Sequence, residues 1–273
     1  MVEEAEGRGR LETSGSVLVT GAAGGLGAAV VDRFVAGGWQ VYAADLTPPA
    51  ARDGVVPLRL DVTDQASVDA ALAGIDRLDC VVNFAGVLGV GPLMEVPAEQ
   101  LQRVLDINVL GTHRVNRAAF ALLRAGGGRI INISSETGWQ RALPMNGPYA
   151  MSKHAVEAYS DALRRELMLV GVPVVVVQPG PFRTSMTADL GTVLRARVTD
   201  DSPFATLARR TAKGAAREGA KAHDPAELAE VVWTAATVAR PRARYAVRTD
   251  PMRRVLHHLP VPVADRLLRR VLG

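Results

Sequence analysis

The chain contains a single cysteine, Cys80, among its 273 residues. One thiol cannot form an internal disulfide, so a disulfide-stabilised fold is excluded and a reduced, cytoplasmic setting is expected. No apolar run approaches the roughly 18 residues that a membrane-spanning helix needs. The first 15 residues are charged and rich in glycine and lack the apolar core of a signal peptide, so we expect residues 1–15 to be a disordered lead-in.

Excess charge of one sign, repeats and metal-ligand clusters are lacking too. The 32 basic and 28 acidic residues leave a net charge of only +4, with arginines alternating with acids, which gives little support to nucleic-acid binding. His257 and His258 are adjacent but lack the further ligands of a metal site, so no metal is expected. No segment of the chain repeats itself. Length and apolar content fit one large α/β domain, residues 16–273.

The most informative stretch is Tyr149-Ala-Met-Ser-Lys153, at the start of an apolar-periodic run from Ala150 to Val170. Residues four apart lie one above the other on a helix, so the phenol and the ammonium are expected side by side. A nearby ammonium favours the phenolate and is expected to lower the pKa of the phenol, which then exchanges protons with a carbonyl or an alcohol. A plain surface contact gives the same spacing.

A glycine-rich loop follows the first predicted strand, Ser16-Val-Leu-Val-Thr20, and precedes a helical run to Val35. The pattern is Thr-Gly-x-x-x-Gly-x-Gly, with glycines at 21, 24, 25 and 27. Glycines at this place allow a tight turn and let backbone amides approach a pyrophosphate at the start of a helix. A glycine turn without a ligand is the alternative, but the order strand, loop and helix favours dinucleotide binding.

Asp45 ends the second predicted strand, Gln40 to Ala44, about 20 residues after the glycine loop. A carboxylate there is placed to bond ribose hydroxyls and to repel a 2′-phosphate. No Arg or Lys stands in the loop or directly after Asp45 to offset that charge, which favours NAD(H) over NADP(H). A turn-capping Asp is the alternative.

Further polar motifs fall where predicted strands end. Asp61 follows the strand Val55 to Leu60, Asn83-Phe-Ala-Gly86 follows Leu78 to Val82, and Ser134-Ser135 follows Gly128 to Ile133. Strands that alternate with helices predict a parallel sheet between helical layers, and such sheets bind ligands beyond the carboxyl ends of their strands. Ser135, though often a turn residue at such a place, is therefore expected to face the same cleft as Tyr149. Asn108 is unusual within a predicted helix, Pro97 to Arg124, and indicates a kink or a bound water there.

These motifs together resemble the short-chain dehydrogenases/reductases, in the single-domain group without an added substrate domain. The resemblance covers residues 16 to 185, and the stretch from Gly147 to Leu167 is similar to the branch of retinol, 17β-hydroxysteroid and 3-hydroxybutyrate dehydrogenases. Phe84 and Gly24 depart from the commonest family residues, at positions that vary. The resemblance implies a doubly wound Rossmann fold with a seven-stranded, mostly parallel sheet. It also implies an oxidoreductase of alcohols and carbonyls that uses NAD(H), with NADP(H) as the alternative, and a homodimer or homotetramer.

The resemblance also implies roles for individual residues. Tyr149 is the expected general acid/base, Lys153 lowers its pKa and holds the nicotinamide ribose, and Ser135 bonds the substrate oxygen. Asn108 is expected to hold a water that links Lys153 to solvent. The cofactor-binding residues are expected to be Gly21, Gly24, Gly25, Leu26, Gly27, Asp45, Asp61, Val62, Asn83, Ala85, Gly86, Tyr149, Lys153, Pro179, Gly180 and Thr184.

Two segments remain beyond the motifs. Residues 185–223 mix apolar and basic residues and are expected to form an amphipathic lid over the substrate; a solvated helical insertion is the alternative. Residues 250–273 have near-helical spacing and either cover the pocket, pack on a partner subunit or touch a membrane surface; we favour packing. Five apolar residues near the expected cleft suggest an apolar substrate: Leu88, Leu93, Met94, Leu143 and Met145. A redox-sensing protein without turnover is the alternative outside the enzymes, and the complete set of proton-relay residues disfavours it.

Overall fold

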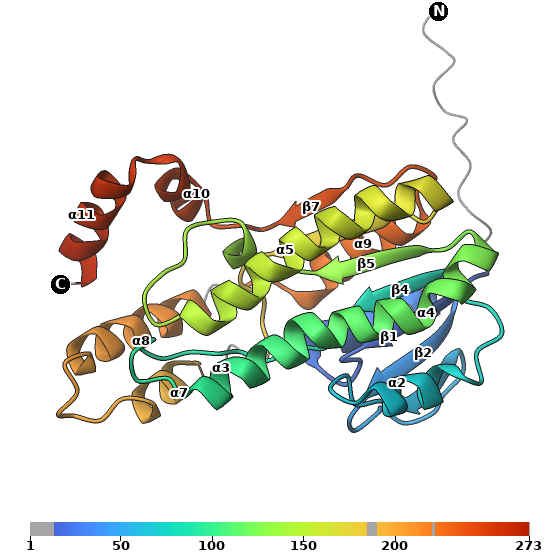
Figure 1. Cartoon of the computed structure of the whole chain (residues 1–273), viewed down its shortest axis with the longest axis horizontal. Coiled ribbons are helices and arrows are strands. Elements are labelled where there is room, and N and C mark those ends of the chain that lie inside the picture. The colour runs from blue at the N-terminus through green and yellow to red at the C-terminus, as the bar shows by residue number, and fades with distance from the viewer. Residues whose placement is uncertain (1–13, 185–189, 220–221, 273) are drawn as a thin grey trace, which may run out of the picture.

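The computed structural model describes residues 14–184, 190–219 and 222–272. In this part of the chain, one seven-stranded sheet has the order β3-β2-β1-β4-β5-β6-β7, and every neighbouring pair is parallel (Figure 1). The strands are β1 (Ser16–Thr20), β2 (Gln40–Asp45), β3 (Val55–Arg59), β4 (Cys80–Asn83), β5 (Arg129–Ile133), β6 (Val174–Pro179) and β7 (Arg244–Val247).

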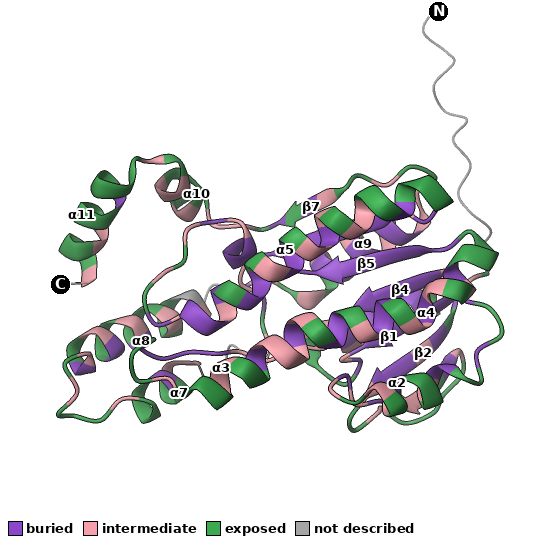
Figure 2. Ribbon diagram, viewed as in Figure 1, coloured by how far each residue is buried: buried purple, intermediate pink, exposed green. Residues whose placement is uncertain are grey.

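Helices cover both faces of the sheet, whose central strands β1, β4, β5 and β6 are buried along their whole length (Figure 2). Helices α1 (Gly25–Ala36) and α9 (Pro225–Thr237) pack on one face through Phe34 and Leu228. Helices α2 (Gln65–Leu72), α4 (Thr112–Gly126) and α5 (Gly147–Leu167) pack on the other through Val68, Val115 and Leu167. The predicted doubly wound α/β fold is confirmed.

The strand order positions the site. From β1 the chain runs outward through β2 and β3, then returns to place β4 on the other side of β1. The connecting loops diverge at the carboxyl ends of β1 and β4, and a crevice opens where strand order reverses in this way. The glycine loop, Asp45 and the segment after Asn83 all lie at this end of the sheet.

The helix predicted from Pro97 to Arg124 is interrupted. Helix α3 (Ala98–Leu105) passes into a π-helical turn, η1 (Asp106–Gly111), before α4 begins. The unusual mid-helix Asn108 lies in this turn and is 1% exposed. Single π-helical turns frequently occur at functional sites.

Helices α7 (Leu190–Ala196) and α8 (Ala205–Gly219) form the described part of the expected lid. Their apolar face packs inward: Leu194 and Ala208 form a buried cluster with Val90 and Met145. Residues 185–189, with Met186, and residues 220–221 lie outside the described residues, as does most of the expected lead-in, residues 1–13.

The C-terminal tail forms two helices, α10 (Pro251–His258) and α11 (Val261–Leu272), separated at Leu259 and Pro260. Short 3-10 turns complete the fold at η2 (Glu136–Gly138) and η3 (Met168–Val170). Across the described ranges, none of the helices has the length and apolar content to cross a membrane.

Candidate active site

Two cavities lie side by side at the carboxyl ends of the strands. The first, about 570 Å³, lies over the ends of β1, β2 and β3, and the second, about 340 Å³, lies between the glycine loop and α5. Gly21, Asp45 and Gly86 line both, so the two form one elongated site. Volumes of several hundred cubic ångströms suit small-molecule ligands.

The glycine loop needs its glycines for space. Gly21 has φ +67°, and a Cβ there would lie 2.8 Å from the backbone nitrogen of Ala85. A Cβ on Gly27 would lie 2.1 Å from the backbone oxygen of Gly21. The loop is thus folded back on itself and against the segment after β4. The N-cap of α1, Gly24, makes no side-chain hydrogen bond to the first helical turn, whose N–H groups are the donors that an anion meets at a helix start. These features fit a dinucleotide pyrophosphate.

Asp45 lies at the junction of the two cavities. Its carboxylate accepts a hydrogen bond from the backbone nitrogen of Ala23 at 3.0 Å, which ties the glycine loop to the end of β2. Asp61 and Val62 line the first cavity farther along, and the Asp61 carboxylate accepts from the Thr63 hydroxyl at 2.7 Å. The Thr63 hydrogen bonds hold the pKa of Asp61 below its usual value, so this carboxylate is ionised near neutral pH.

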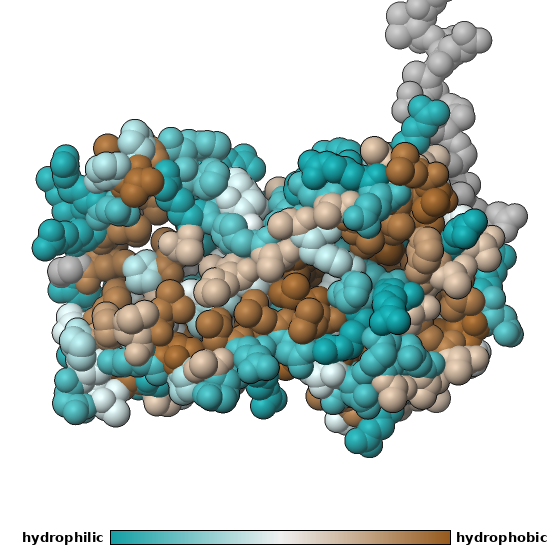
Figure 3. Space-filling view, in the orientation of Figure 1, coloured by the Kyte–Doolittle hydropathy of each residue, from teal (hydrophilic) through white to brown (hydrophobic). Residues whose placement is uncertain are grey.

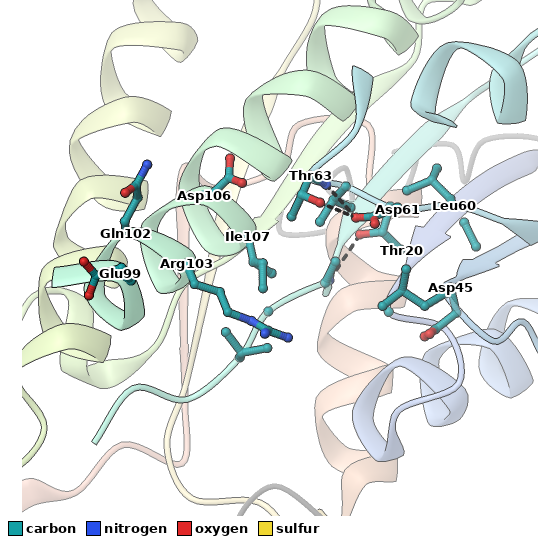
Figure 4. Close-up of a pocket in the computed structure, with 17 residues that line it drawn as sticks. Thr20, Asp45, Leu60, Asp61, Thr63, Glu99, Gln102, Arg103, Asp106 and Ile107 are labelled. Carbon is teal, nitrogen blue, oxygen red and sulfur yellow. Dashed lines mark hydrogen bonds between the residues drawn. The ribbon is translucent and has the colours of Figure 1, made fainter. Parts of the chain in front are cut away.

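Helix α3 supplies cavity residues that the sequence did not indicate. Arg103 extends from α3 across the first cavity toward the side that holds Asp45, with Gln102 and Asp106 behind it (Figure 4). Neither the glycine loop nor the residues directly after β2 hold an Arg or Lys. Arg103 lies 58 positions later, and no sequence motif marks it.

Ser135, Tyr149 and Lys153 meet in the second cavity. The Lys153 Nζ lies 5.6 Å from the centre of the Tyr149 ring, which agrees with the predicted side-by-side arrangement on α5. The Nζ atom donates to the backbone oxygen of Ile133 at 2.9 Å. The Ser135 hydroxyl is hydrogen-bonded to the Tyr149 side chain and accepts from the Thr137 backbone nitrogen at 3.2 Å.

The expected lowering of the Tyr149 pKa is wrong for this structure. Burial disfavours the phenolate and raises the pKa of Tyr149 to about 12, although the hydrogen bond from Ser135 acts in the opposite direction and the charge of Glu136 in the same one. The ammonium of Lys153 is directed to the Ile133 carbonyl, and burial lowers the pKa of Lys153 to about 8. At neutral pH the Tyr149 hydroxyl is therefore protonated, the form that donates a proton.

The remaining expected cofactor residues also line the cavities, except Asn83. Gly24, Gly25, Leu26, Gly27, Pro179, Gly180 and Thr184 line the second cavity, and Val62 and Ala85 line the first. Asn83 is buried beneath them, where its Nδ2 donates to Asn116 at 2.7 Å and to Asn132 at 2.9 Å.

Asn108 lies outside both cavities as well. Its Nδ2 donates to the Val87 oxygen at 3.0 Å and to the Ser152 Oγ at 2.9 Å, and its Oδ1 accepts from the Val87 nitrogen at 2.8 Å. Ser152 in turn donates to the backbone oxygen of Tyr149 at 2.8 Å. Asn108 thus joins the loop after β4 to the start of α5. Its part in a water-mediated proton path stays a prediction.

The five residues expected to make the cleft apolar are spread over different surroundings. Leu88 lines the second cavity. Met145 instead lies under α7 and α8, Leu143 is half-buried and lines neither cavity, and Leu93 and Met94 are 48% and 84% exposed. The apolar character of the substrate therefore rests on fewer residues than the sequence suggested.

Comparison with known proteins agrees with this geometry. Residues 16–194 match the family model for short chain dehydrogenase. The chain is 33% identical to the NADPH-dependent 3-dehydrocapnine reductase of Ornithobacterium rhinotracheale, with 93% of this chain and 94% of the relative covered. It is 37% identical to human retinol dehydrogenase 5 over 63% of this chain and 58% of that protein. The crystal structure of a short-chain dehydrogenase from Streptomyces avermitilis is 28% identical, covers 95% of this chain and 96% of its own, and gives a TM-score of 0.74.

A parallel sheet with a glycine loop and a cavity holding Ser, Tyr and Lys defines a nicotinamide-dependent oxidoreductase. The chain belongs to the short-chain dehydrogenase family, whose members act on CH–OH or carbonyl groups with NAD(P).

Proposed function

We propose that the protein interconverts an alcohol and the corresponding carbonyl in an apolar small molecule, with NAD(H) as the preferred cofactor and Tyr149 as general acid/base. The single observation that carries the proposal is the meeting of Ser135, Tyr149 and Lys153 in the cavity that the glycine loop closes on its other side. A bound nicotinamide dinucleotide supplies or accepts the hydride, and the protein positions it and handles the proton.

The roles follow from the surroundings of each side chain. In reduction, the protonated Tyr149 hydroxyl donates its proton to the substrate oxygen; in oxidation, the deprotonated Tyr149 phenolate takes the proton from the alcohol. The Ser135 hydroxyl donates a hydrogen bond to the same substrate oxygen, where negative charge develops. Lys153, fixed by Ile133, binds the ribose nearest the nicotinamide. Asn108 holds the start of α5, and with it Tyr149, against the loop after β4.

The preference for NAD(H) rests on Asp45. Its carboxylate is fixed by Ala23 at the junction of the cavities, where adenosine ribose hydroxyls would bond to it and a 2′-phosphate would be repelled. An NADP(H)-dependent carbonyl reductase is the second candidate. Arg103 on the wall of the same cavity favours it, because a guanidinium pairs well with phosphate, and the relative from O. rhinotracheale is named as NADPH-dependent.

Assembly into a homodimer or homotetramer is also proposed. Within residues 118–123 and 155–163, Ala119, Leu123 and Val156 are buried in this chain, whereas Ala121, Ala158 and Ala162 are exposed. The support is family resemblance, together with Leu110 and Met151, which stay 48% and 45% exposed beside α4 and on α5.

The test is a turnover screen on the purified full chain. The alcohols 2-octanol, cyclohexanol and all-trans-retinol are each offered with NAD⁺ and with NADP⁺, and formation of the reduced cofactor is followed at 340 nm. We expect turnover that is lost in Tyr149→Phe. Cofactor binding without turnover of any alcohol, or of the corresponding carbonyls in reverse, would favour the redox-sensing alternative.

A further inference from the structure

Helix α10 is joined to the loop that carries Ser135 by a buried ion pair. Glu136, the residue after Ser135, is 6% exposed. Its Oε1 accepts from Arg253 Nη1 at 2.7 Å, and its Oε2 accepts from the backbone nitrogen of Asp250 at 2.7 Å. Arg253 also donates to the Thr137 hydroxyl at 3.3 Å. The start of α10 is therefore bonded to η2 through both side chain and backbone.

The other end of α10 is held by the same loop. The Nε atom of Arg141 donates to the backbone oxygens of Leu256 and His257, both at 3.2 Å, where a helix presents unpaired carbonyls. The rings of Trp139 and His257 meet edge to face, with centroids 5.6 Å apart. Figure 3 shows hydrophobic residues between the C-terminal helices and the lid helices.

Glu136 is coupled to the reacting groups in two ways. Its neighbour Ser135 is bonded to Tyr149, and Ser135 also accepts the Thr137 nitrogen within η2, so displacement of η2 moves the Ser135 hydroxyl. The Glu136 carboxylate also acts on Tyr149 through its charge. The charged and polar groups around Tyr149 are then Ser135 and Glu136 from η2, Lys153 from α5, and Arg253 from α10 behind Glu136.

We propose that Arg253 is a positioning residue of the active site: it anchors and neutralises Glu136, and thereby holds Ser135 and Tyr149 in their reactive arrangement. This proposal rests on the function proposed above, because it assigns the C-terminal helix a part in the same chemistry. The pair is well shielded, with side chains 15% and 7% exposed for Arg253 and Glu136. Loss of one partner of a shielded pair leaves an uncompensated charge, whereas replacement of both partners is often nearly neutral.

The first experiment needs no substrate. Hydrogen exchange of residues 134–141, followed by mass spectrometry, is compared in the wild type, Arg253→Met and the double variant Glu136→Gln/Arg253→Met. Arg269→Met is the control, because it removes one positive charge from an exposed position of the neighbouring helix α11. We expect faster exchange of residues 134–141 in Arg253→Met and partial recovery in the double variant. Equal exchange in Arg253→Met and the control would overturn the proposal.

The second experiment measures oxidation of the best alcohol of the screen between pH 6 and pH 11. We expect kcat to fall by about ten- to a hundredfold in Arg253→Met, with recovery in Arg253→Lys and no change in Arg269→Met. The rise of activity with pH follows deprotonation of Tyr149, whose pKa the charge of Glu136 raises. The rise therefore moves to higher pH in Arg253→Met, where Glu136 is unpaired, and to lower pH in Glu136→Gln, where that charge is absent. A purely structural role for the pair moves neither profile, and unmoved profiles would overturn the proposal.

The two experiments distinguish a failure of this proposal from a failure of the function on which it rests. If Tyr149→Phe keeps wild-type turnover, the proposed function is wrong, whatever Arg253 does. If turnover depends on Tyr149 but not on the Glu136–Arg253 pair, only the positioning role fails. Should Arg253→Met not fold, the profile of Glu136→Gln and the activity of Arg253→Lys decide.

Discussion

Asp45→Asn isolates the charge of the carboxylate from its hydrogen bonding. The carboxamide oxygen of Asn can still accept from the Ala23 nitrogen, now 3.0 Å from Asp45, so the shape of the glycine loop is kept. The negative charge is lost, together with the long hydrogen bond of 3.4 Å that the other carboxylate oxygen accepts from the Thr47 nitrogen. Asp45→Ala also removes the bond to Ala23 and is the less specific change.

The magnitude follows from the distance that a 2′-phosphate would have from Asp45. Two unit charges ~4 Å apart repel by roughly 4 kcal/mol at an effective dielectric constant near 20. Asp45 is partly exposed, and solvent lowers that penalty. If about 1.4 to 4 kcal/mol remains, the wild type prefers NADH over NADPH by ten- to a thousandfold. Asp45→Asn is expected to remove most of this preference by raising the affinity for NADPH, because it deletes the repulsion.

Isothermal titration calorimetry of NADH and NADPH with the full chain gives both affinities. Arg103→Met is the complementary variant. If its guanidinium approaches the phosphate, Arg103→Met loses NADPH affinity and keeps NADH affinity. Equal affinities for the two cofactors in the wild type, or an unchanged ratio in Asp45→Asn, would refute the role of Asp45.

Three further predictions concern the fold and its assembly. Gly27→Ala puts a Cβ 2.1 Å from a backbone oxygen, so we expect this variant to lose NADH binding in the same calorimetric assay. Gly24→Ala is expected to keep NADH binding, because the nearest atom to its Cβ would be 3.4 Å away. Burial lowers the pKa of Lys153 from 10.5 to about 8, so the unfolded chain binds the proton of the Lys153 ammonium more tightly than the folded chain does. The free energy of unfolding in urea should therefore rise with pH between 8 and 10.5 in the wild type relative to Lys153→Met. Equal pH dependence of the two proteins would contradict this prediction. Light scattering at micromolar concentration should give at least twice the chain mass of 28.9 kDa; a monomer would contradict the assembly.

The sheet was predictable because each strand is a short apolar run that ends in a polar or glycine-rich motif. The strand Ser16–Thr20 has the predicted bounds. The unusual Asn108 indicated a kink in the predicted helix, and η1 lies at that residue. The contacts of Asn108 with Val87 and Ser152 were not predictable, because these residues are distant in the sequence. Local propensity carries no information about such contacts.

The sequence predicted which motif residues line the two cavities, with the exception of Asn83 and Asn108, whereas it did not predict their electrostatics. Spacing alone predicted that Tyr149 and Lys153 are neighbours, but the pKa of Tyr149 depends on burial, which raises it. Arg103 and Arg253 come from helices outside the motifs and reach the site only through the tertiary fold.

The most direct test of the proposed chemistry is the turnover of Tyr149→Phe with the alcohol that the wild type oxidises best. The variant keeps the ring and loses the hydroxyl, so NADH affinity should stay close to that of the wild type. Turnover should fall by about 10²- to 10⁴-fold, as is typical when a general acid/base is removed. Turnover near the wild-type level, with cofactor binding intact, would contradict the assignment of Tyr149 as the proton donor and acceptor.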